Sequence, residues 1–166
     1  MMIPRKASAL KYYPTKKDTD WAILYSTWCG SSRDAAVWIS EGMNGIADVF
    51  DVKENPDLSG YNHVVIGGSI RSATTSSLLQ DYLTKHRALL APKIRGYFAV
   101  CGNMTRPVTD QLYTQFFSDH LIKLTGVENV PQRIFLGRIT WGLMEPDVRE
   151  QMQSFPGMVE YDNLKR

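Results

Sequence analysis

Short apolar runs alternate with amphipathic stretches along most of the chain. The first of four such runs is continuously apolar, which is typical of a strand that helices cover on both faces of a sheet, and the other three are expected to be parallel strands of the same sheet. The four runs are residues 21–25 (WAILY), 63–68 (HVVIGG), 96–101 (GYFAVC) and 133–137 (RIFLG). Residues 47–52 (ADVFDV) instead alternate between apolar and polar positions, which predicts a strand at the edge of the sheet.

Amphipathic stretches with helical spacing lie between and after these strands. Ser32 is placed to cap the first expected helix, and Leu78 belongs to the apolar stripe of the second. The expected helices are residues 34–43, 78–90, 107–124 and 146–155. The positions of the first helix that are predicted to face the core are Ala35, Ala36, Trp38, Ile39 and Met43.

Strands and helices follow one another at intervals of roughly 35 to 40 residues, which is the spacing of βαβ units. The pattern therefore predicts an α/β fold around a parallel sheet. Residues 1–20 lack periodicity and contain Pro4 and Pro14, so we expect an irregular N-terminal extension before a single domain at residues 21–166. Residues 156–166 show no pattern and are expected to be loosely structured.

A ligand site is expected at one edge of this sheet. Right-handed crossovers bring the carboxyl ends of parallel strands to the same edge, and open α/β sheets bind their ligands there. The loops that follow Tyr25, Gly68, Cys101 and Gly137 would line that edge.

The first of these loops has the chemistry of an anion site. Residues 25–33 read YSTWCGSSR, so hydroxyl groups and Gly30 directly precede the start of a helix. The unpaired N–H groups at a helix N-terminus and the helix dipole favour a phosphate at this point. Serine and threonine hydroxyls add further donors. We interpret this loop as the floor of the site.

Composition and charge narrow the class of protein only modestly. The chain has 166 residues, of which 43% are hydrophobic and 22% charged, as in ordinary globular domains. A net charge of +2 indicates neither a nucleic-acid nor a membrane partner. No apolar run approaches the roughly 20 residues that span a bilayer, and residues 1–20 lack the apolar core of a signal peptide. A cytoplasmic protein is therefore expected.

Two segments resemble flavodoxins. Residues 26–32 (STWCGSS) match the longer version of that family's hydroxyl-rich phosphate loop. Residues 57–71 (DLSGYNHVVIGGSIR) resemble the subgroup of flavodoxin-like proteins that includes menaquinone-dependent protoporphyrinogen oxidase. Its members share an Asp-x-x-x-Tyr turn, an apolar strand and a Gly-x-Ser-Ile-Arg loop. The chain departs from classical flavodoxins in being slightly basic and in having no aromatic residue at positions 69–77.

This resemblance implies a three-layer flavodoxin-like fold, with a five-stranded parallel sheet of order 2-1-3-4-5 and a tightly held FMN. In the family the first loop holds the phosphate, and the next two loops flank the isoalloxazine ring. Carried over by position, the phosphate residues are Ser26, Thr27, Trp28, Cys29, Gly30, Ser31 and Ser32. The residues on one side of the ring are Ser69, Ile70, Arg71 and Ser72, and those on the other are Cys101, Gly102, Asn103 and Met104.

The W-C-G sequence at residues 28–30 also resembles a thioredoxin-type redox site, in which a cysteine at a helix N-terminus has a lowered pKa. Ser32 stands where the resolving cysteine would be, so we expect Cys29 to lend its backbone N–H to the phosphate instead. A Cys29–Cys101 disulfide is not expected. Their strands would flank a third and stand roughly 10 Å apart, whereas a disulfide needs Cα atoms within about 7 Å.

Arginines are expected around the rim at positions 71, 106 and 138, either as solvated loop charges or as groups that stabilise a reduced, anionic flavin or attract an acidic substrate. Trp141 either covers the ring or packs against the domain. The three histidines, His63, His86 and His120, lack the spacing of metal ligands, and no metal site is expected.

These observations predict an FMN-binding flavoprotein in which the flavin carries the chemistry and no side chain need act as nucleophile or base. Two uses stay open: an oxidoreductase acting on a quinone or porphyrinogen-like substrate, and an electron carrier that meets a redox partner protein. A non-catalytic flavin- or phosphate-binding sensor or interaction module is the alternative. We expect no nucleic-acid partner, and a homodimer stays open.

Overall fold

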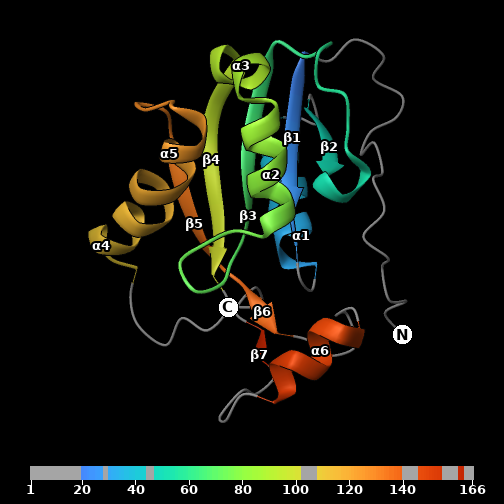
Figure 1. Ribbon diagram of the computed structural model, residues 1–166, viewed down its shortest axis with the longest axis vertical. Coiled ribbons are helices and arrows are strands. Elements are labelled where there is room, and N and C mark those ends of the chain that lie inside the picture. Colours follow the sequence, from blue (N-terminus) through green and yellow to red (C-terminus); the bar gives the residue numbers. More distant parts are fainter. Residues whose placement is uncertain are drawn as a thin grey trace.

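Five parallel strands form the central sheet of the computed structural model, in the order β2-β1-β3-β4-β5 (Figure 1). The structure describes residues 20–27, 30–43, 47–101, 108–139, 146–154 and 161–162. The strands are β1 (Trp21–Ser26), β2 (Ala47–Asp51), β3 (His63–Ile70), β4 (Ile94–Cys101) and β5 (Gln132–Leu136). The expected α/β fold and sheet order are confirmed, and β2 lies at an edge as its alternating pattern predicts.

Helices cover both faces of this sheet (Figure 1). Helix α1 (Ser31–Gly42) connects β1 to β2, and a short 3₁₀ turn, η1 (Val52–Glu54), follows β2. The expected helix at residues 78–90 is divided into α2 (Ser77–Lys85) and α3 (Arg87–Leu90), which the 3₁₀ turn η2 (Ala91–Lys93) follows. The helix between β4 and β5 comprises α4 (Asp110–Tyr113), a π-helical segment (Thr114–Leu121) and α5 (Ile122–Thr125).

Each face of the sheet has its own hydrophobic core, and β1 contributes to both. Ile23 and Tyr25 pack with Ala35 and Ala36 of α1. Ala22 and Leu24, the alternate positions of the same strand, belong to the larger core under α2 and the π-helical segment. Side chains alternate between the two faces along a strand, so a strand covered on both faces must be apolar throughout. This is the physical reason for the continuous WAILY run.

Three expectations about α1 and α2 are wrong. Trp38 is 43% exposed and Leu78 is 45% exposed, although both were expected to face the core. At about 100° per residue, Trp38 lies on the flank of the arc that Ala35 and Ala36 centre, and Leu78 lies in the first turn of α2, beside a pocket described below. Ser32 lies inside α1 and does not cap it, because Gly30 is the N-cap.

A small second sheet lies beyond the carboxyl ends of the five strands (Figure 1). Strands β6 (Arg138–Ile139) and β7 (Tyr161–Asp162) pair in antiparallel fashion, with helix α6 (Pro146–Gln153) between them in the chain. A loop was expected after Gly137 and loose structure at residues 156–166; both expectations are wrong for the two short strands, and residues 140–144, 156–160 and 163–166 lie outside the described residues. Their pairing is non-local and only two residues long, so the sequence carries no periodic signal for it.

Candidate functional site

The first loop turns tightly from β1 into α1. Gly30 has a φ of 87°, in the left-handed region that only glycine adopts without strain. Its backbone N–H donates a hydrogen bond to Thr27 Oγ1 (2.9 Å), and its carbonyl accepts one from Asp34 N (3.1 Å). The loop geometry therefore requires glycine at position 30. Trp28 and Cys29, which were expected to contact the phosphate, lie outside the described residues.

The second loop lies directly beside the first. Ser31 and Ser32 open α1 and are buried. The Ser32 hydroxyl shares a 2.7 Å hydrogen bond with the hydroxyl of Ser69, near the end of β3. Because β1 and β3 are neighbours in the sheet, the structure brings together two of the three loops that were expected to form the site.

Ser26, at the end of β1, has a buried hydroxyl group. The residue is 3% exposed, and its Oγ makes no hydrogen bond with any residue that the structure describes. Gly68 is its register partner on β3, and a Cβ at position 68 would lie only 2.3 Å from that Oγ. Glycine at position 68 thus leaves room around a hydroxyl that the fold itself does not satisfy.

The second loop continues into a strained turn. Arg71 N donates to Thr74 O (2.8 Å), and Thr74 N donates to Arg71 O (3.1 Å), so Ser72 and Ala73 form a two-residue connection. Their φ angles are 51° and 62°. Turns with two positive φ angles are normally built from Asn-Gly or similar pairs, because side chains with a Cβ are strained there. Arg71, at the start of the turn, is half-buried.

Thr75, which follows this turn, is held from three directions. Its backbone N–H donates to His120 Nε2 (2.9 Å), and its hydroxyl lies 2.8 Å from the same nitrogen. Its carbonyl accepts a hydrogen bond from Gln80 Nε2 (2.8 Å). His120 was considered in the sequence only as a metal ligand. Its role lies in a contact 45 residues away along the chain, for which the sequence carries no signal.

The third loop begins at Cys101, where β4 ends. Burial raises the pKa of the Cys101 thiol, so it is protonated near neutral pH. Cys101 is a free cysteine. The other expected residues of this loop and rim lie outside the described residues: Gly102, Asn103, Met104, Arg106 and Trp141. Cys29 lies outside them too, so the proposed distance between the two thiols stays a prediction. Arg138 is placed at the start of β6.

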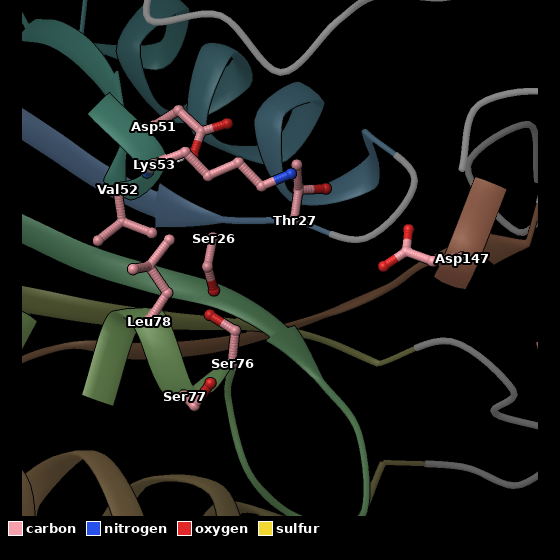
Figure 2. Close-up of a pocket in the computed structure, with 9 residues that line it drawn as sticks. All are labelled: Ser26, Thr27, Asp51, Val52, Lys53, Ser76, Ser77, Leu78 and Asp147. Atoms are coloured by element: carbon pink, nitrogen blue, oxygen red, sulfur yellow. Dashed lines mark hydrogen bonds between the residues drawn. The ribbon is translucent and has the colours of Figure 1, made fainter. Parts of the chain in front are cut away.

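A pocket of about 250 Å³ opens beside the first loop. Ser26 and Thr27 were expected there from the sequence. The sequence did not predict the remaining lining residues, which come from β2, η1, α2 with its N-cap, and α6: Asp51, Val52, Lys53, Ser76, Ser77, Leu78 and Asp147. Figure 2 shows the Ser26 and Ser76 side chains turned toward one another and the Lys53 amine extending toward Thr27. The pocket joins the ends of β1 and β2 to the first turn of α2.

Asp51 is the buried acid of this pocket. Its Oδ1 accepts a hydrogen bond from Lys53 N (2.9 Å), while no described residue pairs with its Oδ2. Burial raises the pKa of the Asp51 carboxyl, whereas the hydrogen bond from Lys53 N and the positive charges of Lys53 and Arg33 act in the opposite direction. Arg33 likewise has a buried Nη1 that finds no partner within the described residues. Burial, followed by the nearby Asp51 charge, raises the pKa of Tyr25.

The family model that matches this chain is that of the flavodoxin domain, which covers residues 22–164. The chain therefore belongs to the flavodoxin domain family. Family membership supports FMN as the cofactor and a redox function carried by it. In the part of the chain that the structure describes, no helix is both long enough and apolar enough to cross a membrane.

Known proteins that resemble the chain include the protoporphyrinogen IX dehydrogenase [quinone] of Escherichia coli K12, which is 32% identical over 83 residues. That match covers 47% of this chain and 46% of the relative, so it spans about half the length of each. Among solved structures, a flavoprotein from Lactobacillus acidophilus in complex with FMN is 12% identical, with a TM-score of 0.48 over 70% of this chain and 93% of that one. The rubredoxin:oxygen oxidoreductase of Desulfovibrio gigas is 15% identical, with a TM-score of 0.48 over 82% of this chain and 34% of that one.

Proposed function

We propose that this protein holds FMN at the carboxyl edge of its sheet and passes electrons or a hydride equivalent through it. The observation that carries the proposal is the buried Ser26 hydroxyl, which has no hydrogen-bond partner among the described residues and lies beside a glycine in the loop where this family binds a phosphate. A buried hydroxyl without a partner costs free energy in the folded protein. A ligand oxygen placed against it recovers that cost, so the site fits a phosphate-bearing cofactor.

The residues proposed to hold the cofactor are those that the sequence resemblance implies. The first loop, residues 26–32, would surround the phosphate next to the N-terminus of α1. Residues 69–72 and 101–104 would flank the ring on its two sides. When bound, FMN supplies the redox chemistry by taking up and releasing one or two electrons. The protein's own part is to bind the flavin, orient it and control what approaches it.

A quinone or porphyrinogen-like molecule is the substrate class that we favour over a partner protein. The E. coli relative is named as a dehydrogenase of protoporphyrinogen IX that uses a quinone, and it is 32% identical over the shared segment. The net charge of +2 also differs from the acidic rim with which electron carriers commonly meet basic partners.

Titration of FMN with the purified protein tests the cofactor proposal. Binding should quench the fluorescence of FMN and shift its visible absorption. Ser26→Ala should weaken binding by roughly tenfold, because one hydrogen bond to a charged group is lost. Ser59→Ala, in an exposed turn, is the matched control and should bind as the parent does. Absence of binding by the parent protein would overturn the proposal and favour a non-flavin function.

The substrate class is tested with the reduced, FMN-loaded protein in stopped flow. Oxidation by a water-soluble quinone should saturate with quinone concentration, as a binding site requires. Oxidation by a small basic redox protein should be slower and should not saturate. The reverse pattern would assign the protein as an electron carrier.

A further inference from the structure

We propose that His120 is a positioning residue for the cofactor site: it holds Thr75 and thereby fixes the strained turn at residues 71–74 beside the flavin. The inference rests on the proposed FMN site and adds a residue that lies far from it in the sequence. His120 would not touch the cofactor. It would act through the second loop.

The turn needs an external anchor. Ser72 and Ala73 both have positive φ angles, a backbone conformation that costs non-glycine residues free energy. The two hydrogen bonds between Arg71 and Thr74 close the turn, but they span only four residues. Such strain persists where the surrounding structure holds it in place. The contacts that do so are at Thr75.

His120 supplies the central contact of this anchor. Its Nε2 accepts the Thr75 backbone N–H at 2.9 Å, so the proton of the neutral ring lies on Nδ1. The Thr75 hydroxyl, 2.8 Å away, shares the same nitrogen. Both residues are buried, His120 at 8% exposure and Thr75 at 3%. Loss of the acceptor would leave a buried backbone N–H without a partner, which is costly.

The helix around His120 has an unusual geometry. His120 lies near the end of the π-helical segment Thr114–Leu121, whose hydrogen bonds skip one residue more than those of an α-helix. Phe116, Phe117 and Leu121 of the same segment are buried in the core under α2. Four of the eight residues of the segment are buried, His120 included. π-Helical turns are often found at functional sites.

Protonation of the His120 ring would break its hydrogen bond with the Thr75 N–H. A charged ring carries a proton on Nε2 and cannot accept the Thr75 N–H. Burial lowers the pKa of His120 below its ordinary value. The charged side chains on α2 and on the helix of His120 are exposed. They are Asp81 and Lys85 on α2, and Asp119 and Lys123 on the helix of His120. Arg71, before the turn, is half-buried.

Three variants test this role by FMN affinity between pH 7.5 and 4.5. His120→Leu removes the acceptor and should weaken FMN binding about tenfold at pH 7.5. His120→Gln retains an acceptor that does not titrate and should bind within about twofold of the parent at pH 7.5. His86→Leu is the matched control for a lost half-buried histidine, at the end of α2 far from the site, and should leave the affinity unchanged.

The phosphate of FMN titrates near pH 6, and this changes the affinity of every variant. The quantity to compare is therefore the ratio of the parent's dissociation constant for FMN to that of His120→Gln, measured at each pH. This ratio should be near one at pH 7.5 and should rise at least threefold by pH 4.5, because only the parent can protonate residue 120. If His120→Leu fails to fold, the ratio alone decides. In the cofactor-free protein, hydrogen exchange of the Thr75 amide should be faster in His120→Leu than in the other variants.

A parent protein that binds FMN while His120→Leu binds equally well would overturn the positioning role and leave the proposed function intact. A flat ratio across the pH range would do the same. If the parent itself fails to bind FMN, the proposed function is overturned, and the positioning role for the cofactor with it.

Discussion

The two loops that meet at the Ser32–Ser69 hydrogen bond differ in how their polar groups are satisfied. In the second loop the N–H, hydroxyl and carbonyl groups of Thr75 all have protein partners. At the first loop, the Ser26 hydroxyl has no partner in the described structure, and it stands beside a pocket. The polar groups of Thr75 in the second loop are therefore satisfied within the protein, whereas the proposed FMN site would supply a ligand partner for Ser26 in the first.

This difference predicts different effects of substitutions in the two loops. A preformed loop fixes shape and costs nothing to order when a ligand arrives. A loop with unpaired buried groups loses stability in the free protein and recovers it on binding. Substitutions in the second loop should therefore affect the free protein, and substitutions in the first should mainly affect binding.

Gly68→Ala should have the largest effect, because position 68 lies between the two loops. A Cβ there would meet Ser26 Oγ at 2.3 Å and the Ser26 carbonyl at 3.0 Å. We expect a loss of about 1–3 kcal/mol in the free energy of unfolding and FMN binding weakened by more than tenfold. Urea denaturation and FMN titration measure both. Gly60→Ala, where a Cβ would meet nothing within 4 Å, is the control, and equal effects at the two positions would refute the steric argument.

Thr75→Val and Ser26→Ala test the contrast between the two loops most directly. Thr75→Val removes a hydroxyl that is within bonding distance of His120 and should lower the stability of the cofactor-free protein by about 1 kcal/mol. Ser26→Ala removes a hydroxyl that has no partner among the described residues, so the cofactor-free protein should be as stable as the parent or slightly more so. Chemical denaturation without FMN decides between them. Equal destabilisation by both changes would contradict the contrast between the loops.

Asp51→Asn should stabilise the protein by about 1 kcal/mol at pH 7, because it removes a buried charge but retains an oxygen for Lys53 N. The pKa of Asp51 is higher in the folded than in the unfolded chain, so folding is penalised once the pH rises through the folded pKa. The advantage of Asn should therefore disappear as the pH falls toward the unfolded value of about 4. Unfolding measured from pH 7 to 4 tests this, and a constant difference would show that charge is not the cause.

Ala73→Gly should have the smallest effect, a gain of about 0.5 kcal/mol. Glycine relieves the strain of a φ of 62°, and part of the gain is offset by the greater freedom of glycine in the unfolded chain. Ala88→Gly, at an exposed position in α3, should instead cost about 1 kcal/mol. Thermal unfolding of the two variants should thus shift in opposite directions. A loss at both positions would mean that the turn is not strained.

The sequence predicted the elements of the sheet because burial on two faces leaves a local trace. The mainly apolar runs identified β1, β3, β4 and β5, and the alternating run identified the edge strand β2. Helix faces were predicted less well. Trp38 fits an apolar stripe by residue type, yet it is exposed because Ala35 and Ala36 centre the buried arc.

The candidate site was likewise predicted only in part from the sequence. Hydroxyl-rich loops after apolar strands are visible in the sequence, and the structure places Ser26, Ser32 and Ser69 together. Lys53, Ser76 and Asp147 reach the pocket from elements that no local pattern connects to the first loop. His120 is the clearest case, since its bond to Thr75 joins residues 45 positions apart.

By itself, the sequence determined the α/β class, the edge position of one strand and the set of loops that lie at one edge of the sheet. These follow from local periodicity and from the chirality of βαβ connections, both of which act on neighbouring residues. Only the tertiary structure decided which hydroxyls are satisfied, which turn is strained and which histidine holds it. Those properties depend on contacts between distant segments, and a hydrogen bond across the fold has no periodicity that a chain can display.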